Sequence, residues 1–231
     1  GAGAAAGAIA AGHGRTLATE ADRRDVLRFA FDGHRVVAPQ GSGIDVAASA
    51  LGGVLRFQKL GDGVVAEALA WPASGLVPVL LWTGAPARTS ELVARVEALR
   101  EAAPARYESA MSPIREAAEA FVVALERSDA AAAIDALDAH GRAMEALGVA
   151  ASAPIVTEAL ARVAQLAREL GGAAKPSGAG GGDVAIALVR DDAAAARLAA
   201  ACGAEGIEHI AAALGVEGVR CEPDRERDAR C

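Results

Sequence analysis

The sequence predicts an α+β protein with two domains, and three observations carry this prediction. Apolar runs typical of strands occupy residues 54–57, 64–71 and 76–82. A long region of helical periodicity follows, over residues 90–170. A fully apolar strand, 184–189, comes after a glycine-rich stretch. This order predicts a split β-α-β sandwich, in which helices cover one face of an antiparallel sheet.

Composition and charge exclude several functional classes. Hydrophobic residues make up 53% of the 231 residues but aromatic residues only 3%, so a helical protein with a core of Ala, Val and Leu is expected. The net charge of −7 argues against a nucleic-acid partner, which requires a basic surface to neutralise phosphates. No apolar run reaches the roughly 20 residues of a membrane span, so no membrane partner is expected.

The cysteines indicate the cellular compartment. Cys202, Cys221 and Cys231 are odd in number and show no C-x-x-C spacing. They argue against a disulfide scaffold or a zinc site and favour free thiols in a reducing compartment. We therefore expect a cytoplasmic protein.

Local signals predict the elements in order. Thr19 with Asp22 has the pattern of a capping box, and it begins an amphipathic helix over 20–35. A helix of small residues is expected over 3–12, and Asp62-Gly63 marks the turn of a hairpin. The remaining helices are expected at 44–51, 90–102, 105–127, 129–147, 155–170, 191–201 and 204–214, with a last strand near 216–221.

These elements group into two domains and a tail. The expected domains are 1–75, which resembles the remainder of a larger domain, and 76–222. Residues 223–231 form a charged tail, expected to be solvated. The chain begins abruptly in small residues without a methionine, so we expect further sequence before Gly1.

A glycine-rich loop over residues 175–183 is the first candidate site. Four glycines and an alanine stand between a helix and an apolar strand, and Lys175 and Ser177 add a cation and a hydroxyl. Glycines let successive backbone N–H groups face one concavity, which binds anions. The alternative is a flexible linker, but the strand that follows fixes one end of the loop. The loop is not a P-loop, because the lysine precedes the glycines.

The second candidate is Asp45, which follows Gly41-Ser42-Gly43 at the start of a short helix. The residue type alone leaves two interpretations open. Asp45 is either a catalytic carboxylate or an acidic residue that the helix macrodipole favours at this position.

Both segments resemble motifs of the GHMP kinases. Residues 41–49 followed by Gly52-Gly53 resemble the S-G-x-D…G-G segment of that superfamily, and residues 175–183 resemble its third, glycine-rich motif. The resemblance covers about residues 20–220. It implies an N-terminal part related to ribosomal protein S5 domain 2, a ferredoxin-like C-terminal domain, and ATP with Mg²⁺ as cofactors.

Three further features resemble the bacterial phosphomevalonate kinases within this superfamily: His34-Arg35, the Asp183 that closes the glycine motif, and residues 81–93, which are similar to a W-T-G-x-P-A-x-T segment. The implied reaction transfers the γ-phosphoryl group of ATP to 5-phosphomevalonate, giving 5-diphosphomevalonate in isoprenoid biosynthesis. Phosphorylation of the mevalonate 5-hydroxyl is one alternative.

A non-catalytic relative that only binds a ligand or partner is the other alternative. The family's second motif, P-x-x-x-G-L-G-S-S-A-A, supplies an ATP-phosphate loop with serines. The nearest match here is residues 1–6, which have alanines in place of those serines, unless the motif lies before Gly1.

The resemblance assigns roles to individual residues. Asp45 is implied to be catalytic, and the partner is a small phosphorylated substrate, with a homodimer left open. The implied substrate-binding residues are Ser42, Gly43, His34, Arg88, Thr89 and Ser90. The implied phosphate- and ATP-binding residues are Lys175, Ser177, Gly178, Ala179, Gly180, Gly181, Gly182 and Asp183. No side chain is assigned as a metal ligand.

Overall fold

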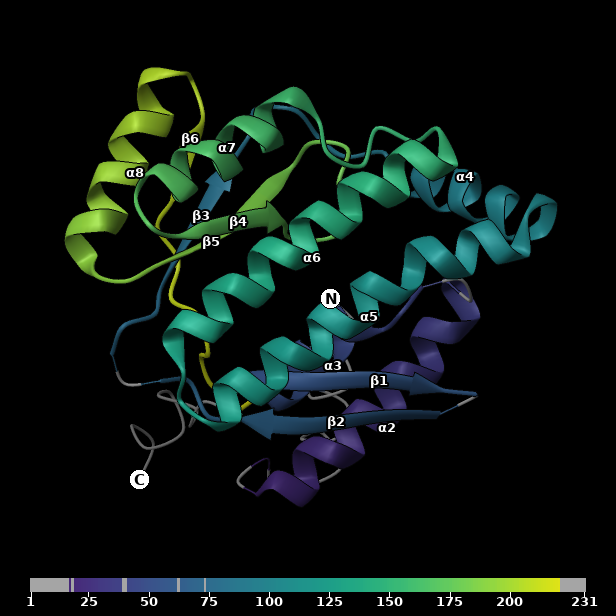
Figure 1. Cartoon of the computed structure of the whole chain (residues 1–231). Helices are drawn as coiled ribbons and strands as arrows, with labels where there is room; N and C mark the ends of the chain where they lie inside the picture. Colours follow the sequence, from purple (N-terminus) through teal and green to yellow (C-terminus); the bar gives the residue numbers. More distant parts are fainter. Residues whose placement is uncertain (1–16, 18, 39–40, 62, 73, 221–231) are drawn as a thin grey trace, which may run out of the picture. The chain divides into compact units, whose positions relative to one another are not determined.

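The structure is a computed structural model that describes residues 17, 19–38, 41–61, 63–72 and 74–220. The chain forms two compact units, and each is described here by itself. Unit 1 comprises residues 1–70 and 213–231, and unit 2 comprises residues 71–212. Both contain helices and an antiparallel sheet, which confirms the α+β prediction (Figure 1). The domain limits drawn from the sequence, 1–75, 76–222 and 223–231, stay predictions.

Unit 1 packs two helices with a β-hairpin. Its elements are α2 (Glu20–Val37), α3 (Ile44–Leu51), β1 (Val54–Leu60) and β2 (Gly63–Leu69). The predicted capping box is present: Asp22 N–H donates to the Thr19 hydroxyl, and the Asp22 carboxylate accepts from Thr19 N–H. Val26, Leu27 and Ala30 of α2 pack with Val46, Ala47 and Ala50 of α3 in one buried cluster.

The C-terminal segment of the chain returns to unit 1. Gly52 and Glu217 form a single antiparallel bridge, and Gly53 N–H donates to the Val216 carbonyl at 2.8 Å. Val219 N–H donates to the Ser49 carbonyl at 3.0 Å. The strand predicted near 216–221 is therefore wrong for the residues described there, because they make this one bridge and no ladder.

Unit 2 contains a four-stranded antiparallel sheet. Its strands are β3 (Val77–Trp82), β4 (Ala173–Pro176), β5 (Val184–Val189) and β6 (Glu208–Ile210), in the order β4-β5-β3-β6. With β5 and β3 central, this is the strand order of a ferredoxin-like sheet. The sequence analysis missed β4. It is a short edge strand that ends in Pro176, a position where a strand tolerates the missing N–H of proline.

Five helices accompany this sheet: α4 (Thr89–Ala102), α5 (Pro104–Glu126), α6 (Ala130–Ala151), α7 (Glu158–Glu169) and α8 (Asp192–Ala204). Helices α7 and α8 lie over one face of the sheet (Figure 1). There Val163, Ala167, Leu198 and Cys202 pack with inward residues of β3, β4 and β5. The cluster consists largely of Ala, Val and Leu, as the composition predicts.

The helix predicted over 204–214 is wrong. α8 ends at Ala204, Gly206 takes a left-handed conformation with φ of 79°, and Glu208–Ile210 pair with β3 as β6. Residues 208–210 instead fill the free edge of β3, and this tertiary pairing overrides local helix propensity there. The helix predicted over 3–12 and the tail 223–231 lie outside the described residues.

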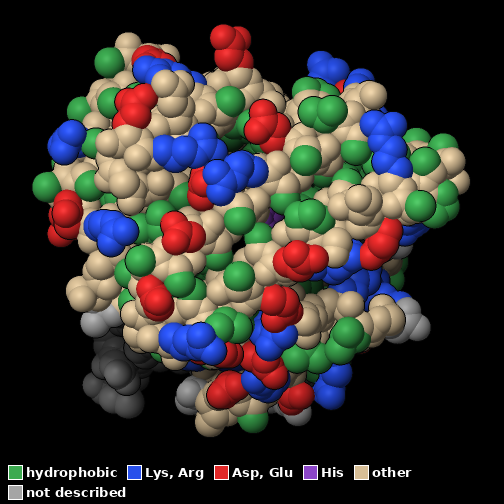
Figure 2. Space-filling view, viewed as in Figure 1, with side chains coloured by type: hydrophobic (Ala, Val, Ile, Leu, Met, Phe, Trp, Pro, Cys, Tyr) green, Lys and Arg blue, Asp and Glu red, His purple; other side chains and the backbone are tan. Residues whose placement is uncertain are grey.

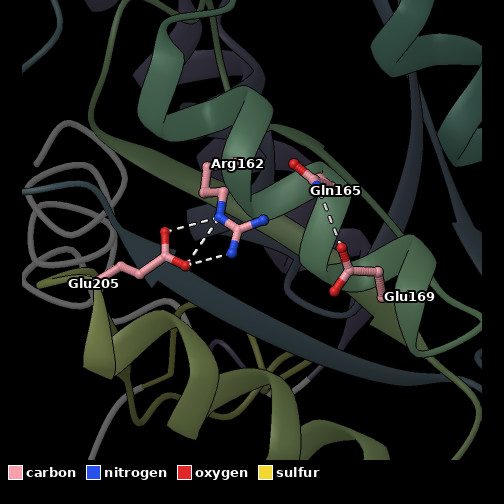
Figure 3. Close-up of polar contacts among 4 residues, drawn as sticks. All are labelled: Arg162, Gln165, Glu169 and Glu205. Atoms are coloured by element: carbon pink, nitrogen blue, oxygen red, sulfur yellow. Dashed lines mark hydrogen bonds and ion pairs between the residues drawn. The ribbon is translucent and has the colours of Figure 1, made fainter.

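The surface carries charges of both signs. Figure 2 shows Lys and Arg side chains interspersed with Asp and Glu on the face in view. One such contact joins two helices: Arg162 on α7 makes a two-pronged ion pair with Glu205, the residue that caps α8 (Figure 3). This hydrogen-bonded pair lowers the pKa of Glu205 and raises that of Arg162.

Among the described helices, none combines the length and apolar character needed to cross a membrane.

Candidate functional site

The glycine-rich loop of unit 2 connects β4 to β5. Its backbone enters the left-handed region at four successive residues, with φ of 83° at Gly180, 80° at Gly181, 120° at Gly182 and 61° at Asp183. Side chains rarely adopt such angles, so this path requires glycine at most of its positions. The predicted loop therefore has one specific conformation, which argues against the alternative of a flexible linker.

Backbone carbonyls outside the loop hold it in this conformation. Gly181 N–H donates to the Ile155 carbonyl at 2.8 Å, and Asp183 N–H donates to the Ala85 carbonyl at 2.6 Å. The Asp183 carbonyl in turn accepts from Thr83 N–H at 2.9 Å. A Cβ on Gly182 would stand 2.7 Å from the Ala85 oxygen, so this close approach also excludes any side chain there.

Several N–H groups of the loop have no partner. Among the described residues, no carbonyl or side chain accepts a hydrogen bond from the N–H groups of Gly178, Ala179, Gly180 and Gly182. Gly178 is exposed, with open space around the position of a Cβ. Unpaired N–H groups in consecutive residues form a nest with partial positive charge, which suits the oxygens of a phosphate.

A cavity of about 360 Å³ opens on this loop. That volume lies in the range of small-molecule sites. It is lined by Leu80, Ala87, Thr89, Ser177, Gly178, Ala179, Gly180, Gly182, Asp183, Val184 and Ile210. Thus the structure brings Thr89 together with the loop, although the two are almost 90 residues apart in the sequence.

The first turn of α4 adds to the positive character of the cavity. Thr89 is the first residue of α4, whose N-cap Arg88 makes no side-chain capping bond. Unpaired N–H groups at a helix N-terminus attract anions. Arg88 and Ser90 are exposed beside Thr89, and the Arg88 guanidinium pairs with Glu91 at 3.2 Å. They flank the cavity without lining it.

Lys175 occupies a different place from the rest of its motif. It lies on β4 and does not line the cavity. Its ammonium donates to the carbonyl of Pro176 at 2.8 Å, and burial lowers its pKa to about 8. Its predicted role as a direct phosphate ligand stays a prediction, and the geometry suggests an indirect one.

The Asp45 segment lies in unit 1. Gly43 is the N-cap of α3 with φ of 77°, and a Cβ there would stand 2.2 Å from the Phe31 ring. His34, near the end of α2, lies against the same loop, since a Cβ on Gly41 would stand 2.4 Å from the imidazole Nε2. That Nε2 is buried and has no hydrogen-bond partner among the described residues.

The Asp45 side chain is exposed in the first turn of α3, and Ser42 precedes it in the loop. The Ser42 hydroxyl accepts from Ile44 N–H at 3.4 Å. The structure therefore places His34 against the loop that carries Ser42 and Gly43 and leads into Asp45. Their functional roles stay predictions.

The sequence analysis missed the residues that shape the loop from outside. Ile155 and Ala85 act through their backbone carbonyls, which any residue type supplies, so no sequence signal marks them. Leu80, Val184 and Ile210 line the cavity from three strands. The apolar runs of β3 and β5 were predicted as strands, but β6 was not predicted and Ile210 could not be placed.

The chain is similar to known proteins in sequence and in fold. Residues 120–208 match the family model described as GHMP kinases C terminal. A phosphomevalonate kinase of Streptomyces sp. (strain CL190) is 30% identical over 210 residues, which are 82% of this chain and 54% of that protein. The chain thus spans about half the length of this curated relative.

Solved structures share the fold. The Lin0012 protein from Listeria innocua superimposes with a TM-score of 0.77 at 25% identity, covering 81% of this chain and 58% of that one. The phosphomevalonate kinase of Streptococcus pneumoniae, in complex with phosphomevalonate and AMPPNP, superimposes with a TM-score of 0.70 at 20% identity, covering 80% and 59%. Sequence motifs, fold and family match agree: the chain carries a GHMP kinase C-terminal domain and belongs to the GHMP kinase superfamily.

Proposed function

We propose that the chain forms part of an ATP-dependent kinase that phosphorylates 5-phosphomevalonate. One observation carries the proposal most directly: the cavity is bounded by four unpaired N–H groups of the glycine loop and by the first turn of α4. Such a site fits a phosphate group. The 30% identity to a phosphomevalonate kinase favours this substrate among those of small-molecule kinases.

The reaction forms a bond between a phosphate oxygen of the acceptor and the γ-phosphorus of ATP. The bond from that phosphorus to the β–γ bridging oxygen breaks, and ADP leaves with the electron pair. Such transfers depend mainly on positioning and charge neutralisation. The unpaired N–H groups of Gly178, Ala179, Gly180 and Gly182 bind phosphate oxygens, while Thr89, Ser90 and Arg88 hold the anionic acceptor.

Asp45 orients the acceptor in this scheme. A phosphate monoester is largely dianionic at neutral pH, because its second pKa is about 6, and it scarcely needs a base. Ser42, Gly43 and His34 shape the loop around Asp45. With a hydroxyl acceptor such as mevalonate, Asp45 would instead remove the hydroxyl proton as a general base.

The donors in the cavity fit an Mg²⁺ ion that arrives with a nucleotide. Mg²⁺ takes one or two carboxylates with hydroxyls, waters and substrate phosphates. Here the Asp183 carboxylate and the hydroxyls of Ser177 and Thr89 belong to cavity-lining residues. No described residues form a cluster of three or more His, Cys, Asp or Glu side chains that would hold a metal alone. When bound, the ion neutralises charge on the phosphates.

The test is ADP release by the full-length protein with ATP–Mg²⁺ and either 5-phosphomevalonate or mevalonate. We expect turnover with 5-phosphomevalonate, reduced about 100-fold or more in Asp45→Ala by loss of positioning. Asp192→Ala is the matched control, since Asp192 is also an exposed acidic residue in a helical first turn. It is expected to leave kcat unchanged.

Two other outcomes would change the assignment. Turnover with mevalonate alone would move it to the preceding phosphorylation step. A folded protein that is silent with both acceptors would contradict the proposal and favour a non-catalytic binding role.

A further inference from the structure

Lys175 is a half-buried cation whose ammonium has no counter-charge among the described residues. Three elements pack against β4: α6, α7 and β5. β5 carries no ionisable side chain. On α6, Asp138 is already paired with Arg142 at 2.8 Å and with Arg168 of α7 at 2.7 Å. No carboxylate of the described residues pairs with the Lys175 ammonium.

The nearby ionisable group on α6 is His140, which is half-buried. Burial, with a smaller contribution from the charge of Lys175, lowers the pKa of His140 to about 4, and a backbone hydrogen bond opposes this change. Its Nδ1 is buried without a partner among the described residues. His140 is therefore a neutral neighbour at physiological pH and does not compensate Lys175.

Close packing brings α6 to this position. Gly141 follows His140, and a Cβ on it would stand 3.1 Å from the Ala174 carbonyl and 3.3 Å from the Lys175 Cβ. The helix thus covers the lysine stem. An ammonium withdrawn from water normally requires compensation, and among the described residues its one hydrogen bond is to the Pro176 carbonyl.

That bond fixes the first peptide group of the glycine loop. The Pro176 carbonyl accepts from the Lys175 ammonium at 2.8 Å, and the N–H of the same peptide, on Ser177, donates to the Val184 carbonyl at 2.8 Å. The Pro176–Ser177 peptide is thereby held at both ends. It directly precedes Gly178 and Ala179, whose N–H groups are unpaired.

We propose that Lys175 is a positioning residue for the glycine loop, whose ammonium sets the Pro176–Ser177 peptide and whose unpaired positive charge is compensated when the loop binds a phosphate. This inference rests on the proposed function in one respect, because it assumes that the glycine-rich loop binds a phosphate. Lys175 therefore acts on phosphate binding without touching the phosphate.

The proposal makes phosphate affinity depend on pH. At an effective dielectric constant near 20, a unit charge about 8 Å from an anion changes its affinity roughly 10-fold or more. Lys175 loses its proton as the pH rises through about 8, so its contribution to affinity disappears above that pH. Conversely, a bound anion raises the pKa of Lys175. His140 stays neutral throughout this range.

The composition makes the test direct, because the chain contains only two lysines, Lys59 and Lys175. Lysine labelled with ¹³C at Cε gives two side-chain signals in the full chain, and Lys175→Arg assigns them. Pyrophosphate is the probe. Its binding is followed through the ¹⁵N-labelled amides of the loop glycines, from pH 6.5 to pH 9.5.

We expect pyrophosphate to shift the glycine amides and to raise the pKa of Lys175, with the Lys59 signal as the internal reference. Lys175→Met, similar in length but uncharged, should bind pyrophosphate about 10-fold more weakly at pH 7 and as tightly as wild type near pH 9.5. Comparing the proteins at each pH cancels the titration of pyrophosphate itself. Lys175→Arg, which keeps the charge and donors, should recover most of the affinity.

Equal affinity of wild type and Lys175→Met at every pH would overturn the inference, as would the absence of pyrophosphate binding at the wild-type loop. Should Lys175→Met not fold, Lys175→Arg decides: affinity near wild type supports the inference and a pH-independent loss refutes it. These binding measurements do not depend on turnover. If the ADP-release assay showed no activity while these binding results were obtained, the proposed kinase function would be refuted and the positioning role of Lys175 would remain supported.

Discussion

The Ile155 carbonyl oxygen lies where a side chain on Gly180 would begin: a Cβ at Gly180 would stand 2.1 Å from it. The same oxygen accepts the hydrogen bond from Gly181 N–H. The loop therefore depends on a backbone carbonyl that precedes α7. Glycine is required at position 180 for two reasons, the close approach of this carbonyl and the φ of 83°.

Gly180→Ala should consequently destabilise unit 2 and abolish pyrophosphate binding. A side chain in the left-handed region costs about 1–2 kcal/mol, and displacing the Ile155 carbonyl adds to this, so we expect a loss of at least about 2 kcal/mol. Urea unfolding followed by tryptophan fluorescence measures it, because Trp71 and Trp82, the two tryptophans of the chain, both lie in unit 2.

Gly178→Ala is the matched control for stability. No atom lies within 4 Å of a Cβ at Gly178, and its φ is not in the left-handed region. We expect unfolding within about 0.5 kcal/mol of wild type. A loss as large as that of Gly180→Ala would mean that the Ile155 contact is not what makes glycine necessary.

Lys175→Met should stabilise the fold. The pKa of Lys175 is lowered from 10.5 in the unfolded chain to about 8 by burial, so holding the proton in the folded state costs roughly 3 kcal/mol below pH 8. Between pH 8 and pH 10.5 the unfolded chain binds the proton and the folded one does not, so wild-type stability rises there.

The advantage of Lys175→Met should therefore be greatest at pH 7 and shrink toward pH 10.5, as measured by urea unfolding across this range. A constant difference between the two proteins from pH 7 to pH 10.5 would show that the Lys175 ammonium is well solvated. Greater stability joined to weaker pyrophosphate binding would mark Lys175 as a residue kept for function.

His140→Gln should flatten the acid limb of the stability curve. The pKa of His140 falls from 6.5 to about 4 on folding, mainly through burial. The stability linked to this group is present above pH 6.5 and is lost as the pH falls toward 4, amounting to roughly 2–3 kcal/mol. As the pH falls from 6.5 to about 4, the free energy of unfolding of wild type should fall by this amount relative to that of the variant. Parallel pH dependences of the two proteins would contradict a lowered pKa for His140.

Leu198→Ala tests the core under the sheet. Leu198 is fully buried in the cluster that joins α7, α8 and the strands, so its truncation should cost roughly 2–5 kcal/mol. Val149→Ala on α6 is the control, because Val149 is 74% exposed, and its truncation should change stability by less than about 0.5 kcal/mol. Similar losses for the two variants would contradict the packing described.

The long helices and central strands could be predicted from sequence because their signals are local. The capping box at Thr19 marks where α2 begins, and the apolar runs of β3 and β5 identify buried strands. β4 and β6 escaped prediction because they are short edge strands whose existence depends on a neighbour. Ala173–Pro176 has no strand pattern of its own, and it becomes a strand by pairing with β5.

The site was predictable to the same degree. The glycines and Asp183 were identified because a left-handed backbone favours glycine, which is visible in the sequence. Thr89 was identified because it belongs to the recognisable segment 81–93. Lys175 was grouped with them by proximity in sequence, yet it lies on β4, does not line the cavity that Ser177 lines, and donates its hydrogen bond to the Pro176 carbonyl.

The division of unit 1 along the chain bears on its biosynthesis. Residues 216–219, which hydrogen-bond to Ser49 and Gly53, leave the ribosome some 160 residues after their partners. Unit 2, residues 71–212, is continuous and is synthesised completely in between. Unit 2 is therefore complete before unit 1 receives its last segment. A stalled or truncated product would contain the glycine-rich loop but would leave the unit that carries Asp45 incomplete.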